Sequence, residues 1–217
     1  MAEINYYETE NNQSIHTLVL SDEGKSLTAF WVRHLCGYGL DTSFDPIYVL
    51  ENVIPQFDSS FNYVIIEENE WDYGDSVHAF YTPVENTITV RCDIYDQALD
   101  GFNMAQITIT HEIVHYFQSA IVTFLQAFQC TNFKTELCEV NSDQMIRHEE
   151  QTDSITSLVL IPQQITAGKT EDEIFDDFIA KPVSLFLTGL MRNIFKELLD
   201  VIPNFLLHSK NLNKIAS

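Results

Sequence analysis

Positive charge is the scarcest property of this 217-residue sequence, which has 11 lysines and arginines against 32 aspartates and glutamates, a formal net charge of −21 at pH 7. Such a surface repels a phosphate backbone, so direct nucleic-acid binding is not expected. The charge could attract a basic protein or a cation, or it could serve only to keep the chain in solution. A hydrophobic content of 45% is enough to fill a core, which excludes a disordered protein.

Signals for export or membrane insertion are also missing. The N-terminal stretch MAEINYYETENNQ is acidic and has neither the basic region nor the apolar segment of a secretory signal. The longest apolar stretch, residues 183–207, is interrupted by residues that are costly in a bilayer, namely Arg192, Lys196, Glu197, Asp200 and Pro203. We therefore expect a cytoplasmic protein with no membrane partner.

Cysteine is sparse and carries no metal-binding spacing. The four residues lie far apart or outside any C-x-x-C pattern: Cys36, Cys92, Cys130 and Cys138. A reducing compartment would keep them as thiols, so we interpret them as core residues in preference to a zinc-thiolate site. The sequence also contains no internal repeat and no low-complexity tract.

The first third of the chain is expected to be helical after a polar segment over residues 1–25. Apolar residues recur at helical spacing from Ser26, a candidate N-cap, to about Tyr38, where Gly37 is a stop signal. A short second helix is expected to open at Asp45-Pro46 and to end at Pro55.

Strand patterns follow between residues 61 and 94. The stretch FNYVIIEE predicts one strand, and HAFYTPVENTITVRCDIY predicts two strands joined by the turn 83–86, so a small antiparallel sheet is expected. In the last strand Thr87, Thr89 and Arg91 alternate with apolar residues, which predicts one face in water and one face packed.

The rest of the chain has helical patterns. One runs from Asn103 to about Gln129, the next from Ser142 until Pro162 stops it, and two more are expected within residues 171–199. Helices, then a small sheet, then helices predict the α+β class. We expect one domain over residues 26–165, with residues 166–217 as a helical extension packed on it.

The stretch TITHEIVHYFQ, residues 108–118, places polar groups inside an apolar helical run. His111 and His115 are four residues apart, so both rings can face one metal ion, and Glu112 can reach a water at that ion without becoming a ligand. Short patterns of this kind also recur by chance. Here apolar neighbours would make unsatisfied histidines costly: Ile107, Ile109, Ile113, Val114 and Phe117.

Catalytic zinc needs a third protein ligand, and residues 147–162, RHEEQTDSITSLVLIP, supply candidates on one predicted helix. Glu149 and Asp153 share a face, and His148 and Glu150 would point elsewhere if Glu149 points inward. Asp153 could then accept the remaining ring N–H of a histidine ligand. The helix would pack through Ile146, Ile155, Leu158 and Val159. The alternative is that these acids form a solvated helix face.

Together, THEIVHYFQ and the later E-x-x-x-D-x-I-x-x-x-V-L-I-P resemble the ImmA/IrrE family of intracellular zinc metallopeptidases, and AFYTPVENTITV resembles the strand before its motif helix. The resemblance covers about residues 45–162. Aligning the family's proline with Pro162 selects Glu149 as the ligand. Departures that touch no ligand are Val114 for a frequent glycine, Thr152 for alanine, and Ile155 and Thr156 for a Phe-Ala pair.

The resemblance implies a zincin-like core with the sheet packed on the motif helix, zinc held by His111, His115 and Glu149, and Glu112 as the general base. It also implies a protein substrate, frequently a helix-turn-helix repressor, whose basic charge would suit this acidic chain. Tyr81, His78 and Tyr116 are conceivable oxyanion-stabilising groups, but each is more often a packing or surface residue, so none is assigned. Two alternatives stay open: a non-catalytic binding or sensor module with a structural metal or none, and a small-substrate metallohydrolase.

Overall fold

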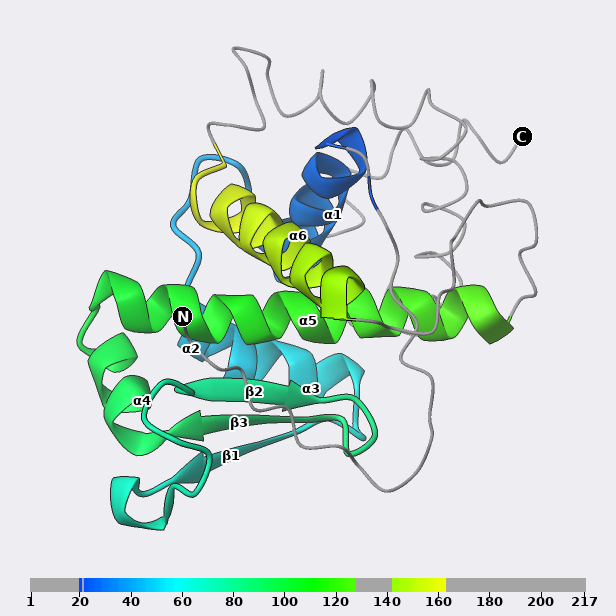
Figure 1. Cartoon of the computed structure of the whole chain (residues 1–217). Helices are drawn as coiled ribbons and strands as arrows, with labels where there is room; N and C mark the ends of the chain where they lie inside the picture. Colours follow the sequence, from blue (N-terminus) through cyan, green and yellow to red (C-terminus); the bar gives the residue numbers. More distant parts are fainter. Residues whose placement is uncertain (1–19, 21, 128–141, 163–217) are drawn as a thin grey trace, which may run out of the picture.

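The computed structural model describes residue 20, residues 22–127 and residues 142–162 (Figure 1). These residues form an α+β structure with the following elements: α1 Asp22–Leu35, α2 Pro46–Tyr48, the π-helical turn η1 Val49–Val53, α3 Ile54–Phe57, β1 Asn62–Ile66, the 3-10 turn η2 Glu68–Glu70, β2 Ala79–Thr82, β3 Thr87–Arg91, α4 Cys92–Leu99, α5 Asn103–Ala127 and α6 Ser142–Leu160.

The sheet is mixed, so the expectation of an antiparallel sheet was wrong. Its strand order is β1-β3-β2, with β2 antiparallel to β3 and β1 parallel to β3. The turn of residues 83–86 is too short for anything but a hairpin, whereas the long connection 67–78 lets β2 cross to the far side of β3. The sequence therefore predicted the pairing of β3 with β2 correctly, but it did not predict the parallel pairing of β3 with β1.

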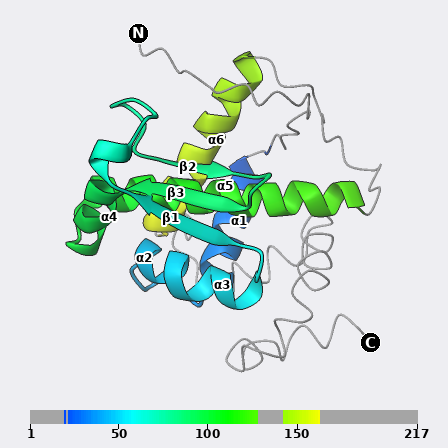
Figure 2. The same ribbon diagram turned by 90° about the horizontal axis from the view of Figure 1, so that it is seen from below.

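The long helix α5 lies between the sheet and the two helices α1 and α6 (Figure 1). Figure 1 shows the sheet on one side of α5, and α6 with α1 on the opposite side. In Figure 2 the sheet lies over α5, with β1 toward α2 and α3 and β2 toward α6. The free edge of β2 therefore lies on the side of the sheet that is directed toward α6 in this view (Figure 2), and β2 contacts α5. One cluster of buried apolar residues joins these elements, including Ile88, Val90, Ile109, Ile113 and Ile155.

The expected wet face of β3 is not present. Thr87 and Thr89 are buried like Ile88 and Val90. The reason is that β3 is the central strand, so each threonine is covered by neighbours on both sides. Thr89 pairs with Val64 of β1 and with Phe80 of β2, whose ring contacts Trp71 and Tyr73 from the preceding loop.

The helix boundaries agree with the sequence pattern in part. The α1 helix begins at Asp22, so Ser26 lies inside it and is not its N-cap. The Ser26 hydroxyl donates to the Asp22 carbonyl, one turn earlier, at 3.0 Å. The expected helix opening at Asp45-Pro46 is confirmed: Asp45 is the N-cap of α2, and its side chain accepts the Tyr48 N–H at 3.0 Å. Pro55 does not end the helix; it lies in the first turn of α3, where its missing N–H has no intrahelical partner to lose.

The two longest predicted helices are confirmed as α5 and α6, whereas α4 was not predicted. Residues 1–19 and 21 of the N-terminal segment lie outside the described residues, as do the helices expected within 171–199 and all of the C-terminal extension. The division at residues 25 and 165 therefore stays a prediction. Within the part of the chain that is described, no helix has the length and apolar character required to span a membrane.

Candidate metal centre

The motif histidines lie near the middle of α5, on the side that faces α6. Both side chains are partly buried, and their ring centroids are 4.6 Å apart. The apolar positions around them pack into the core as expected, with the exception of Ile107, which is exposed: the buried ones are Ile109, Ile113, Val114 and Phe117. The i and i+4 spacing therefore directs both rings out of the core and toward one point.

Glu149 from α6 reaches the same point. Its Oε2 lies 3.1 Å from His111 Nε2 and 3.4 Å from His115 Nε2, and the two Nε2 atoms are 2.9 Å apart. One ligand atom from each of the three residues lies within 4.8 Å of the others. The α5 and α6 helices thus bring together a group that could hold a metal ion.

The chemistry of these three donors fits zinc. Two imidazole nitrogens and one carboxylate oxygen form a ligand set that is known from catalytic zinc sites. Burial lowers the pKa of His111, but the hydrogen bond with Glu149 and the nearby acidic side chains of Glu112, Glu149 and Asp153 together raise it more, so the net shift is upward. Burial raises the pKa of Glu149, and the two histidines lower it well below its usual range. The Glu149 carboxylate beside the two imidazole rings favours a positive charge at this point, and a divalent metal ion can supply that charge as well as a proton can.

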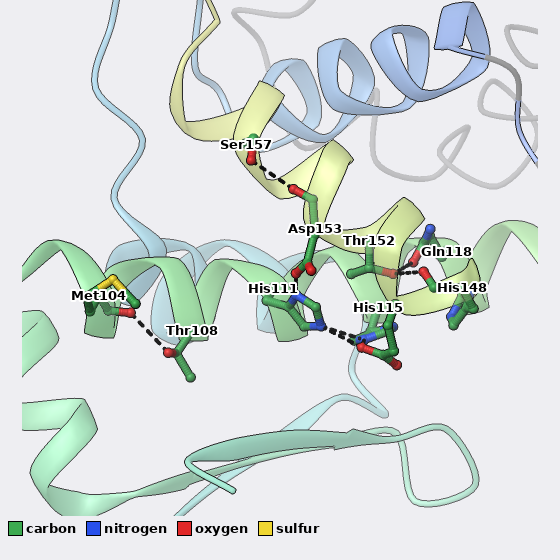
Figure 3. A network of polar contacts seen from close by, with 10 residues as sticks. Met104, Thr108, His111, His115, Gln118, His148, Thr152, Asp153 and Ser157 are labelled. Carbon is green, nitrogen blue, oxygen red and sulfur yellow. Dashed lines mark hydrogen bonds and ion pairs between the residues drawn. The ribbon is translucent and has the colours of Figure 1, made fainter. Parts of the chain in front are cut away.

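Asp153, one turn after Glu149 on α6, contacts the other nitrogen of His111. Its Oδ1 lies 3.0 Å from His111 Nδ1, and Figure 3 shows it reaching from α6 to the ring. A carboxylate at Nδ1 favours the tautomer that carries its proton there, which leaves the Nε2 lone pair free for a metal. The Asp153 side chain is 73% exposed, so the contact is made at the surface of the structure.

Glu112 follows His111 on α5 and contacts the backbone of β2. Only 8% of the residue is exposed, and its carboxylate accepts the backbone N–H of Tyr81. Burial raises the pKa of Glu112, and the nearby histidines lower it, with a net shift upward. Glu112 is not among the three convergent residues. A buried carboxyl with a raised pKa beside a metal-binding group is suited to proton transfer.

The register of the hairpin explains how β2 reaches Glu112. The Arg91 N–H donates to the His78 carbonyl, so these residues form a hydrogen-bonded pair next to β2. Because such pairs alternate along an antiparallel ladder, Phe80 and Thr82 bond to β3, whereas Ala79 and Tyr81 direct their backbone groups to the free edge. The Tyr81 N–H is thus available to a group on α5.

His148 lies beside the site, contrary to expectation. It was expected to point away from the site, but its ring lies 5.1 Å from the ring of His115. Burial lowers the pKa of His148 to about 4, so the ring is neutral at pH 7. Its neighbour Glu150 is exposed as expected. No spacing rule points to His148, because its approach depends on the angle at which α6 crosses α5.

The apolar positions of α6 pack as expected with one exception. In α6, Ile155 and Val159 are buried and Leu158 is partly buried, whereas Ile146 is exposed and does not join the packed side of the helix.

The hydroxyls of Tyr81 and Tyr116 donate to Asn86 and Asp58, respectively. Both hydroxyls are therefore engaged in hydrogen bonds near the turn between β2 and β3, and neither is assigned to an oxyanion.

The structure thus defines an α+β protein with a candidate metal site whose ligand spacing is that of HExxH proteins with a downstream glutamate. No protein-family model, curated protein or solved structure matches the chain.

Proposed function

We propose that this protein is a cytoplasmic zinc-dependent endopeptidase of the zincin type, related to the ImmA/IrrE metallopeptidases. The observation that carries the proposal is the approach of His111, His115 and Glu149 to one point, with Glu112 buried beside them. The spacing of these residues along the sequence and their donor atoms both support a catalytic zinc site.

Each residue of the site would have a separate task. His111 and His115 would bind the metal through Nε2, Glu149 would bind it through its carboxylate, and Asp153 would hold the His111 ring. A bound zinc ion would polarise the scissile carbonyl and lower the pKa of water toward about 7. Glu112 would accept a proton from water and deliver it to the leaving amine, for which its raised pKa is favourable.

An extended peptide could be bound along β2, because β2 is an edge strand next to α5. The outward backbone groups of Ala79 and the Tyr81 carbonyl would pair with the peptide as an added strand. The net charge of −21 favours a basic partner, for which a helix-turn-helix repressor is our proposed example.

Metal analysis and cleavage test the proposal together. We expect about one zinc per chain in the purified wild type, a strong loss in Glu149→Ala, and full retention in Glu112→Gln. Cleavage is measured with a library of quenched fluorescent peptides rich in lysine and arginine. The wild type should cut some of them, and Glu112→Gln should lose at least about 100-fold in rate, the lower range for removal of a general base.

Two results would contradict the proposal in different ways. Zinc retained in Glu149→Ala would show that the third ligand is another residue. A zinc-loaded wild type that cuts neither the peptide library nor folded basic proteins would favour the alternative of a non-catalytic metal-binding or sensor module.

A further inference from the structure

The carboxylate of Asp58, outside the metal centre, connects the end of α3 with the hairpin turn and with α5 through hydrogen bonds. Asp58, the residue after α3, accepts the Tyr116 hydroxyl and the Asn86 side-chain amide through the same oxygen, Oδ2, each at 2.9 Å. Tyr116 lies on α5 directly after His115, and Asn86 lies at the end of the turn between β2 and β3. Asp58 therefore fixes the hairpin turn against the helix that carries the metal ligands.

Asn86 is held in an unusual backbone conformation by contacts on several sides. Its φ of +49° makes it the one residue other than glycine with a positive φ among the described residues. Its side-chain amide donates to Asp58 and, at 2.8 Å, to the Ser60 hydroxyl, and its Oδ1 accepts the Tyr81 hydroxyl at 3.0 Å. Asparagine tolerates the left-handed region, but so many side-chain contacts exceed what a tight turn requires.

Tyr81 connects this turn to the metal centre. Its hydroxyl donates to Asn86 and accepts a hydrogen bond from Ser119 of α5, and its ring lies edge to face with that of Tyr116, 5.9 Å between centroids. The backbone of the same residue faces the free edge of β2 and donates to Glu112. The contacts of the Tyr81 hydroxyl with Asn86 and Ser119 thus affect where the Tyr81 backbone lies relative to α5.

We propose that Asn86 is a positioning residue that acts through Tyr81 to hold the free edge of β2 where its N–H donates to Glu112. In this arrangement the turn, although it contacts neither ligand nor proposed substrate, orients the carboxylate that faces the metal centre. Its bearing on catalysis rests on the proposed role of Glu112, whereas the geometric claim does not.

Amide hydrogen exchange of the full-length, 15N-labelled protein with zinc added tests this inference without any substrate. Asn86→Gly keeps the left-handed backbone and removes the side chain, and Tyr81→Phe removes only the hydroxyl. Each should speed exchange at the Tyr81 amide by at least about tenfold while exchange at Thr89, in the central strand, stays unchanged. The double variant should be no faster than the faster single variant, because both changes break the same link.

Ser60→Ala is the matched control, since it removes one contact of Asn86 but leaves the Tyr81 hydrogen bond. It should change Tyr81 exchange by less than about twofold. The inference is overturned if Tyr81 exchange is unchanged in Asn86→Gly, if Thr89 accelerates equally, or if the two substitutions have additive effects. All of these outcomes can be read in a protein that cleaves nothing, so failure of the proposed peptidase activity is distinguished from failure of this inference.

Discussion

The three candidate ligands differ in what holds each side chain in place. His111 is contacted on both ring nitrogens, by Glu149 on one side and Asp153 on the other. His115 has the ring of His148 beside it. A ligand with a fixed ring orientation needs less ordering when a metal binds, so Asp153 should contribute to metal affinity although it is not a ligand.

Asp153→Ala should weaken zinc binding by about 10- to 100-fold, the usual cost of losing a carboxylate that orients a histidine ligand. Competition with a chromophoric chelator measures the affinity. Glu150→Ala, an exposed acid on the same helix, is the control and should bind zinc as the wild type does. Equal losses in the two variants would mean that only the negative charge of α6 matters.

The Asp58 carboxyl predicts a pH dependence of stability. Burial raises the pKa of Asp58, but hydrogen bonds from Ser60, Asn86 and Tyr116 together lower it more. The folded-state pKa is therefore below the unfolded value of about 4. Its stabilisation is therefore present above pH 4 and is lost as the pH falls through the lower folded-state pKa. Asp58→Asn should be less stable by about 1–2 kcal/mol at pH 7, and this gap should narrow below pH 4.

Urea unfolding of the wild type and Asp58→Asn at several pH values measures this gap. A stability difference that is the same at pH 7 and pH 3 would show that the charge of Asp58 makes no contribution.

At the scale of elements, α6 is the piece that completes the site, because it carries both Glu149 and Asp153. Its position depends on α1, which packs along it. Arg33 of α1 is 1% exposed. Its guanidinium donates to the Val159 carbonyl near the end of α6, and to the Gly39 and Thr42 carbonyls in the loop after α1. The Val159 carbonyl belongs to the last turn of α6, where a helix leaves carbonyls without intrahelical partners.

Arg33→Met should destabilise the protein by about 2–4 kcal/mol, because buried carbonyl groups lose their donors. Thermal unfolding measures the loss. Lys25→Ala on the same helix removes an ion pair with Asp22, whose side chain is 99% exposed, and should change little. Equal effects of the two substitutions would contradict a structural role for the buried guanidinium.

At the scale of the whole molecule, the net charge of −21 dominates the electrostatics. Like charges at this density repel one another, and salt screens the repulsion over about 8–10 Å at physiological concentrations. Ion pairs such as Asp22 with Lys25 and Arg91 with Asp93 leave this excess of negative charge unchanged.

Raising NaCl from about 20 mM to about 500 mM at pH 7 should therefore increase the melting temperature by about 2–5 °C. Differential scanning calorimetry measures the shift. Near pH 4, where about half of the carboxylates are protonated, the increase should become smaller. A melting temperature that falls with salt would show that attractive pairs outweigh the repulsion.

The sequence by itself determined the α+β class, the hairpin, the long helices α5 and α6, and the side chains that meet at the candidate metal site. Each of these depends on spacing along one helix or across one tight turn, where covalent geometry sets which side chains are neighbours. Only the tertiary structure decided that β1 pairs parallel to β3, that the threonines of β3 are buried, and that Arg33, His148 and the Asn86 network matter. These features depend on how distant segments cross, and no local periodicity records a crossing angle.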